Sequence, residues 1–143
     1  MDRGLSDEQK RNAASAGCTG PGVTFHPLTP GSESLPSTVP QCDLTGLYND
    51  GFEDVAAHMT ALDAVVTIDS APLHLGGALG VPVIGMLDHV SQWAWGTGES
   101  QRWYDSVTMV RQPKPGDWQS VIKRVASRLQ ALTVERQTKI GLT

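Results

Sequence analysis

The sequence predicts an α/β domain with a mainly parallel sheet, and one stretch of the chain supports this prediction most strongly. Residues 64–86 begin with an apolar, β-branched run, pass through small residues with one histidine, and end in a second apolar run. Neither run alternates with polar residues, which is typical of parallel strands buried on both faces. Strand-like and helix-like segments also alternate further along the chain, which favours a Rossmann-like arrangement in three layers.

The amino-terminal third carries the weakest signals. Ser6 and Gln9 stand in the order of a capping box, which predicts a short helix over residues 6–16. Residues 22–28 are expected to form a short strand. Residues 29–41 are rich in Ser, Pro and Thr, and we expect them to form a loop whose function composition does not reveal.

The pattern sharpens after Cys42. Residues 43–47 are expected to form a short strand, and residues 48–51 a turn. Four apolar side chains in the next segment share one helical face, so we expect an amphipathic helix over residues 52–62 that lies on the sheet. These apolar residues are Phe52, Val55, Met59 and Leu62.

The most informative stretch forms a β-α-β unit in this interpretation. Its strands are expected at residues 65–68 and 82–87. Gly80 supplies the left-handed residue that ends the helix, and Pro82 prevents the helix from continuing. The polar residues of the unit are therefore gathered at the carboxyl edge of the sheet, where open α/β sheets bind their ligands.

The start of this helix predicts an anion site. Pro72 is tolerated near the first helical position, and the side chain of Asp69 or Ser70 is expected to cap the helix. Unpaired N–H groups at residues 70–73 and the positive end of the helix dipole would then point out of the sheet edge. A phosphate group is the ligand that such an arrangement favours.

The rest of the chain completes the alternation. A loop over residues 88–105 holds Trp93, Trp95, Trp103 and Tyr104. We expect Trp93 and Trp95 to anchor this loop to the core, and stacking on a nucleobase or sugar is the alternative. A last strand is expected at residues 107–110. A helix capped by Asp117 follows, and its apolar face consists of Val121, Val125 and Leu129.

Composition narrows the possible functions. With 143 residues the chain has the length of one domain, and its net charge of −4 without a basic block argues against nucleic acid as a partner. No run approaches the about 18 apolar residues of a membrane span. The polar start at Met1 does not resemble a signal peptide, and Cys18 and Cys42 lack metal or redox spacing, so we expect a cytoplasmic protein with free thiols.

These signals suggest three parts in the chain. An amino-terminal segment covers residues 1–21, a Rossmann-like ligand-binding domain covers residues 22–135, and a carboxyl-terminal tail covers residues 136–143. No metal site is expected, because three histidines lack ligand spacing to one another. These are His26, His58 and His89.

Residues 69–83 also resemble a known family. They read Asp-Ser-Ala-Pro-Leu-His-Leu-Gly-Gly-Ala-Leu-Gly-Val-Pro-Val. This is similar to the Asp-Thr-Ala/Gly-x-x-His-Leu-Ala/Gly-Ala-Leu-Gly-x-Pro-Val signature of heptosyltransferase-like glycosyltransferases, including those attached to tetratricopeptide repeats. The resemblance covers about residues 44–130 well and residues 22–31 more weakly. It continues through Trp93-Ala94-Trp95, Arg102-Trp103-Tyr104, Val110-Arg111-Gln112-Pro113 and Pro115-Gly116-Asp117-Trp118.

The resemblance implies a GT-B arrangement, in which the carboxyl-terminal of two Rossmann-like domains holds the nucleotide of a sugar donor. Asp69, Ser70, Ala71 and His74 match the motif that contacts the donor's diphosphate and adjoining sugar. His74 would stabilise the charge of the leaving nucleotide. The alternative is that His74 has only a structural role. Asp69 would repel phosphate, so we expect it to cap the helix or contact a sugar hydroxyl. Pro72 belongs to the same turn. Asp88, at the end of the next strand, is a further candidate for a nucleotide contact.

We therefore expect the donor-binding domain of an inverting, metal-independent glycosyltransferase that takes a nucleoside diphosphate sugar as substrate and needs no cofactor. In the family the amino-terminal domain supplies the acceptor site and the base, and no segment here matches that domain. The chain is thus expected to bind rather than transfer, with a companion acceptor domain or a second copy as partner. The alternative is a non-catalytic protein-interaction module. A complete small enzyme is disfavoured, because the familiar nucleophile and phosphate-loop motifs are missing from the sequence.

Overall fold

The computed structural model describes residues 23–28, 52–98 and 101–141. The chain divides into two compact units, one formed by residues 48–121 and the other by residues 1–47 together with 122–143. Four predicted segments lie outside the described residues and stay predictions. They are the helix over 6–16, the loop over 29–41, the strand over 43–47 and the turn over 48–51.

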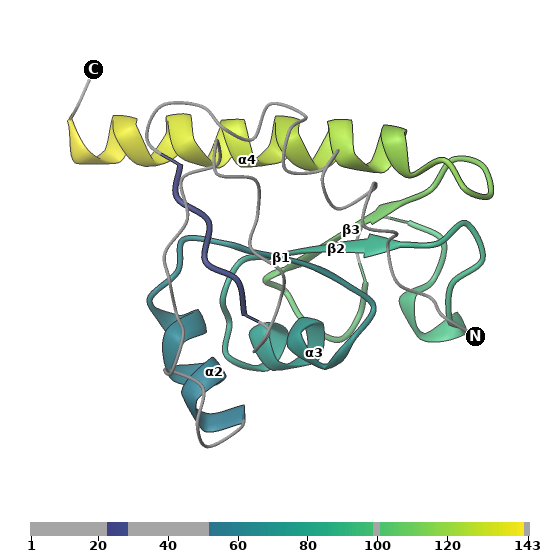
Figure 1. The fold of residues 1–143 in the computed structure, drawn as a ribbon, viewed down its shortest axis with the longest axis horizontal. Coiled ribbons are helices and arrows are strands. Elements are labelled where there is room, and N and C mark those ends of the chain that lie inside the picture. The colour runs from purple at the N-terminus through teal and green to yellow at the C-terminus, as the bar shows by residue number, and fades with distance from the viewer. Residues whose placement is uncertain (1–22, 29–51, 99–100, 142–143) are drawn as a thin grey trace. The chain divides into compact units, whose positions relative to one another are not determined.

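The unit formed by residues 48–121 contains a parallel sheet of three strands in the order β1-β2-β3 (Figure 1). The strands are β1 (Val65–Ile68), β2 (Val83–Leu87) and β3 (Val107–Arg111). Ile68 pairs with Met86, and Leu87 pairs with Arg111, so the carboxyl ends of all three strands meet at one edge. The α/β, Rossmann-like fold is thereby confirmed, and the strands predicted at residues 65–68, 82–87 and 107–110 agree with the structure to within one residue.

Burial differs between the two strands of the β-α-β unit. Every residue of β2 is buried, as expected for a strand with a neighbour on each side. In β1 only Val65 is buried, and the side chain of Val66 is 36% exposed. The prediction that β1 is buried on both faces was therefore wrong. Its physical reason is position, because β1 lies at the edge of the described sheet and an edge strand has fewer neighbours to cover it.

Two helices accompany this sheet. Helix α3 (Ala71–Ala78) packs on β1 and β2, and helix α2 (Phe52–Thr60) packs against α3. Val55 and Met59 are the buried residues of α2, whereas Phe52 is 62% exposed. The helix ends before Leu62, and its main contact is with α3 rather than with the sheet as predicted. Only two of the four apolar side chains are buried, so the buried face of α2 is narrower than predicted.

The boundaries of α3 follow the sequence signals. Ser70 is the N-cap residue in extended conformation, and a proline occupies the first turn. At the other end Gly80 has a φ of 72°, in the left-handed region that favours glycine. This confirms the predicted stop of the helix.

Helix α4 (Trp118–Ile140) begins in the unit that holds the sheet and continues into the other unit. An oxygen of the Asp117 carboxylate accepts a hydrogen bond from the Ser120 amide at 3.1 Å, which confirms the predicted cap. Val121 and Val125 are buried, while Leu129 is half-buried. The domain boundary that we placed at residue 135 falls inside this helix and stays a prediction.

Residues 23–28 do not form the strand that was expected at 22–28. Within this segment only Phe25 makes a β-bridge, and the remaining residues have no regular structure. None of the helices in the described part of the chain is both long enough and apolar enough to cross a membrane.

Candidate functional site

The end of β1 and the start of α3 form the β1–α3 corner, which we define as residues 69–74. Here the Ser70 hydroxyl donates a hydrogen bond to the Ile68 carbonyl at 3.1 Å, and it lies 3.1 Å from the hydroxyl of Thr67. It makes no capping bond to α3. The predicted side-chain cap at Ser70 was therefore wrong, because the hydroxyl is turned back toward the end of the strand.

The corner offers fewer amide donors than the sequence suggested. Pro72 has no amide hydrogen, and the Leu73 amide donates to the Ser70 carbonyl at 3.0 Å. The amides of Ser70 and Ala71 make no hydrogen bond to any other described residue. Two of the amide donors expected at residues 70–73 therefore remain, because Pro72 has none and the first turn closes with an i to i−3 bond from Leu73.

Two carboxylates stand at the same edge. Asp69 is half-buried, and its carboxylate accepts no hydrogen bond within the described residues, so the capping role predicted for it is not observed. Asp88 follows β2, the neighbour of β1 in the sheet. Its carbonyl accepts a hydrogen bond from Arg111 at 3.5 Å. A hydroxyl group is therefore a more suitable ligand for either carboxylate than a phosphate is.

His74 lies about one turn after the start of α3. It lies three and four residues after Ala71 and Ser70, so it shares their face of the helix and leans toward the helix start. Its Nδ1 atom is 3.1 Å from the hydroxyl of Tyr104. Its ring centroid lies 5.0 Å from that of Trp95, which is fully buried. His74 is an exposed residue. Its imidazole ring is nevertheless held in place by two aromatic neighbours.

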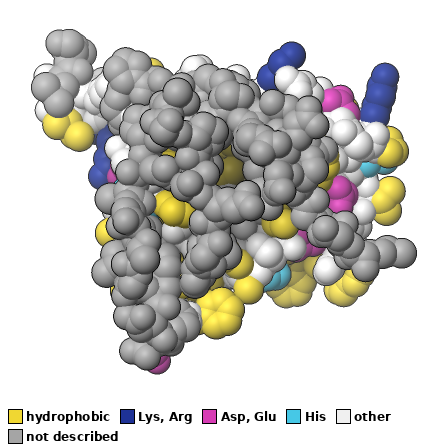
Figure 2. Space-filling view, viewed as in Figure 1, with side chains coloured by type: hydrophobic (Ala, Val, Ile, Leu, Met, Phe, Trp, Pro, Cys, Tyr) yellow, Lys and Arg dark blue, Asp and Glu magenta, His cyan; other side chains and the backbone are white. Residues whose placement is uncertain are grey.

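The loop between β2 and β3 includes a short 3-10 helix, η1 (Trp93–Trp95), that the sequence did not predict. Trp95 is only 1% exposed, which confirms it as an anchor of the loop. Trp93 is 88% exposed, so the anchoring role predicted for it was wrong. The indole N–H of Trp103 donates to the Ala94 carbonyl at 3.0 Å, which ties η1 to the segment that precedes β3. Figure 2 shows that hydrophobic side chains do reach the molecular surface at several separate places.

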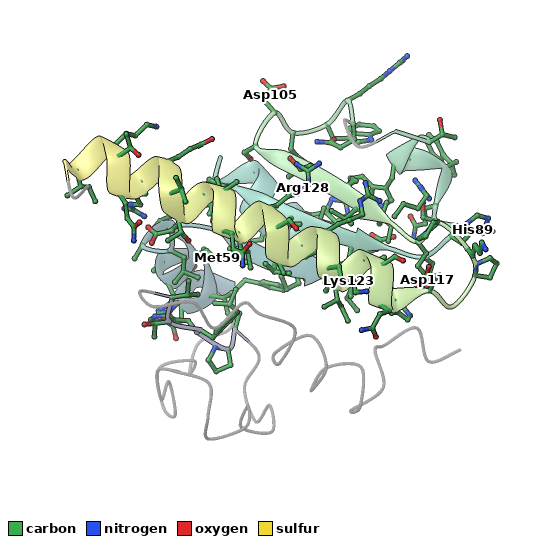
Figure 3. All side chains as sticks on the ribbon, turned by 90° about the horizontal axis from the view of Figure 1, so that it is seen from above. Met59, His89, Asp105, Asp117, Lys123 and Arg128 are labelled. Atoms are coloured by element: carbon green, nitrogen blue, oxygen red, sulfur yellow. The ribbon has the colours of Figure 1, made fainter. Side chains whose placement is uncertain are left out.

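Beyond β3 a buried amide side chain joins two loops. Gln112 is 3% exposed, and its Oε1 atom accepts hydrogen bonds from the amides of His89 at 3.3 Å and Gly116 at 2.9 Å. The Nδ1–H of His89 donates in turn to the Gln112 carbonyl at 3.1 Å. In Figure 3 His89 and the start of α4 at Asp117 accordingly lie at the same end of the sheet.

Arg111 fixes the loop that leaves β2. Its guanidinium donates to the Ser91 hydroxyl and to the Gly96 carbonyl, the latter at 2.6 Å.

No group of three or more His, Cys, Asp or Glu side chains is arranged for a metal ion in the residues described here. Among the described residues, the polar groups of the carboxyl edge thus include main-chain amides, the Ser70 hydroxyl, two carboxylates, two histidines and the loop-fixing Arg111 and Gln112.

Comparison with known proteins places this site in a family. The family model for glycosyltransferase family 9 (heptosyltransferase) matches residues 41–126, more than half of the chain. The chain belongs to glycosyltransferase family 9. The part that matches family 9 includes the β1–α3 corner, Asp88 and the network around Gln112.

A curated relative gives a second comparison for this family 9 chain. It is 36% identical over 78 residues to Protein FlbA of Caulobacter vibrioides. The alignment covers 54% of this chain and 13% of the relative, so the chain spans only a small part of the relative's length. No solved structure gives a significant match.

Three residues of this family 9 site had no role assigned from the sequence, namely Tyr104, Arg111 and Gln112. The last two stand at the carboxyl end of β3, and a polar pair at the end of a buried strand is a signal that could have identified them. Tyr104 gave no such signal, because it lies 30 residues from the histidine that it contacts.

Proposed function

We propose that this family 9 domain, which we place at residues 22–135, binds a nucleoside diphosphate sugar at the β1–α3 corner. The observation that carries the proposal is the combination of two amides, at Ser70 and Ala71, that have no partner among the described residues, with a histidine on the same face of α3. All three residues lie within the part of the chain that matches the family.

The chemistry of the corner suits a diphosphate. The two amides stand at the positive end of α3, which favours donation to phosphate oxygens. His74, one turn further along, donates to the oxygen that carries the growing charge of the leaving nucleotide. Asp69 and Asp88 accept hydrogen bonds from hydroxyl groups of the sugar or ribose.

The reaction that we propose for the completed enzyme is inverting and metal-independent. An acceptor hydroxyl attacks the anomeric carbon, a new carbon–oxygen bond forms, and the bond to the diphosphate breaks. The proton of the hydroxyl passes to a base of a companion domain, and the diphosphate leaves with its charge stabilised by the amides and His74. The domain alone therefore binds its donor but does not transfer the sugar.

Nuclear magnetic resonance titration of the full chain with ADP, GDP and UDP, each free and as a nucleotide sugar, tests the proposal. We expect dissociation constants between about 1 μM and 1 mM, with the largest amide shifts at residues 69–75. If none of these compounds moves those resonances, the proposed function is wrong.

A backbone substitution makes the test specific. Ala71→Pro removes one amide donor at the first helical position, where proline is tolerated, and the extended Ser70, with ψ of 174°, suits a following proline. Because a hydrogen bond to a charged group is worth about 1.5–3 kcal/mol, we expect affinity for the bound nucleotide to fall about tenfold or more. Ala71→Gly keeps the amide hydrogen and is the matched control, for which we expect a change of less than about threefold.

A second candidate function is a protein-interaction module. The observation that favours it is the exposure of Trp93 and Val90, which are 88% and 85% exposed on the loop after β2. Size-exclusion chromatography with and without nucleotide separates the two functions. A stable dimer that nucleotides leave unchanged supports the interaction module, whereas a monomer that gains thermal stability with a nucleoside diphosphate supports donor binding.

A further inference from the structure

The contact between His74 and Tyr104 depends on a glycine. Tyr104 stands just before β3, and its ring packs against α3 at Gly77. A Cβ atom at Gly77 would lie 2.5, 2.7 and 2.9 Å from three atoms of the Tyr104 ring. Only glycine therefore leaves room for the ring to sit close enough to α3 for its hydroxyl to lie 3.1 Å from His74 Nδ1.

The direction of this hydrogen bond follows from the chemistry of the two groups. A phenol hydroxyl is a good proton donor and a weak acceptor, whereas the bare nitrogen of a neutral imidazole is the best acceptor in the pair. Tyr104 therefore donates to Nδ1. A neutral imidazole that accepts at Nδ1 carries its hydrogen on Nε2, so the other ring nitrogen of His74 is a donor.

The second histidine of the carboxyl edge has the opposite arrangement. His89 Nδ1 faces the carbonyl of Gln112 at 3.1 Å, and a carbonyl oxygen only accepts hydrogen bonds. His89 must therefore carry its hydrogen on Nδ1, which leaves its Nε2 bare. The two histidines differ in tautomer because of the partners that the fold gives them.

We infer that Tyr104 is a positioning residue, which holds His74 as the Nε2–H tautomer and fixes its ring so that the free N–H can donate to the leaving diphosphate. The ring of Trp95, with its centroid 5.0 Å from that of His74, restricts the imidazole further. The role toward the diphosphate rests on the proposed function, but the tautomer and the contact with Tyr104 do not.

Long-range proton–nitrogen spectra of the full chain labelled at histidine, recorded at about pH 9 where imidazole is neutral, test the contact directly. We expect hydrogen on Nε2 of His74 and on Nδ1 of His89. Tyr104→Phe keeps the ring beside Gly77 and removes the hydroxyl, so it should shift the Nδ1 resonance of His74 and leave His89 unchanged. A hydrogen on Nδ1 of His74 in the unaltered chain, or an unchanged His74 in the variant, would overturn the inference.

Binding measurements test the consequence for the ligand. For whichever nucleoside diphosphate binds the unaltered chain, Tyr104→Phe should weaken binding about three- to tenfold, as expected for losing the orientation of one hydrogen bond. The same substitution should have no effect in a His74→Ala background, because Tyr104 acts only through His74. An equal loss in both backgrounds would contradict the positioning role. If no nucleotide binds the unaltered chain, the proposed function fails, while the spectra still decide whether Tyr104 controls His74.

Discussion

Gly85 lies at the centre of β2, and replacing it with alanine should destabilise the domain. The new Cβ atom would lie 2.7 Å from Leu73 Cδ1 and 2.7 Å from Met109 Sδ, about 1 Å closer than the usual contact of about 3.5–4.0 Å. Both side chains have no exposed surface, so neither can move into solvent. Inserting a methyl group into such a core costs about 1–3 kcal/mol. Strand propensity alone would favour alanine over glycine by about 0.5–1 kcal/mol.

The net expectation for Gly85→Ala is a loss of about 1–2 kcal/mol in the free energy of unfolding, because overlap with two buried side chains outweighs propensity. Urea denaturation measures this loss, and the thermal midpoint should fall by about 4–8 °C. Met109→Val removes the overlapping sulfur, so the double variant should show a favourable coupling of at least about 0.5 kcal/mol. A more stable Gly85→Ala variant, or strictly additive effects in the double variant, would refute the packing argument.

Three further predictions concern the polar groups that end strands and begin helices. Asp117→Ala should lower the free energy of unfolding by about 1 kcal/mol in urea denaturation, because it removes the cap of α4. Asp117→Ser should retain most of this stability, because serine also caps helices. Gln112→Leu should destabilise by about 2 kcal/mol in the same assay, because it leaves two amides that were paired with its side chain without an acceptor; an unchanged midpoint would contradict this. Arg111→Lys should speed hydrogen exchange at residues 88–98, since an ammonium group cannot reproduce the separate bonds that the guanidinium makes to the loop; exchange equal to that of the unaltered chain would count against it.

The features predicted correctly are those decided within a few residues. The three strands of the sheet were found because uninterrupted apolar runs are visible in the sequence. The end of α3 at Gly80 was found because the left-handed backbone conformation that ends many helices strongly favours glycine. The cap at Asp117 was found because its partner is only three residues away. The β1–α3 corner was located for the same reason, since a polar residue between a strand and a proline-containing helix start is a local pattern.

The sequence alone determined the order of the elements, the parallel sheet and the edge at which the polar residues gather, because all of these follow from short-range periodicity and turn residues. Only the tertiary structure decided what each polar group at that edge has as its partner. It placed Tyr104 against His74 from 30 residues away and buried Gln112 between two loops. A donor or acceptor bonds to whatever the fold brings within about 3 Å, and for groups far apart in the chain that proximity is set by packing rather than by sequence spacing.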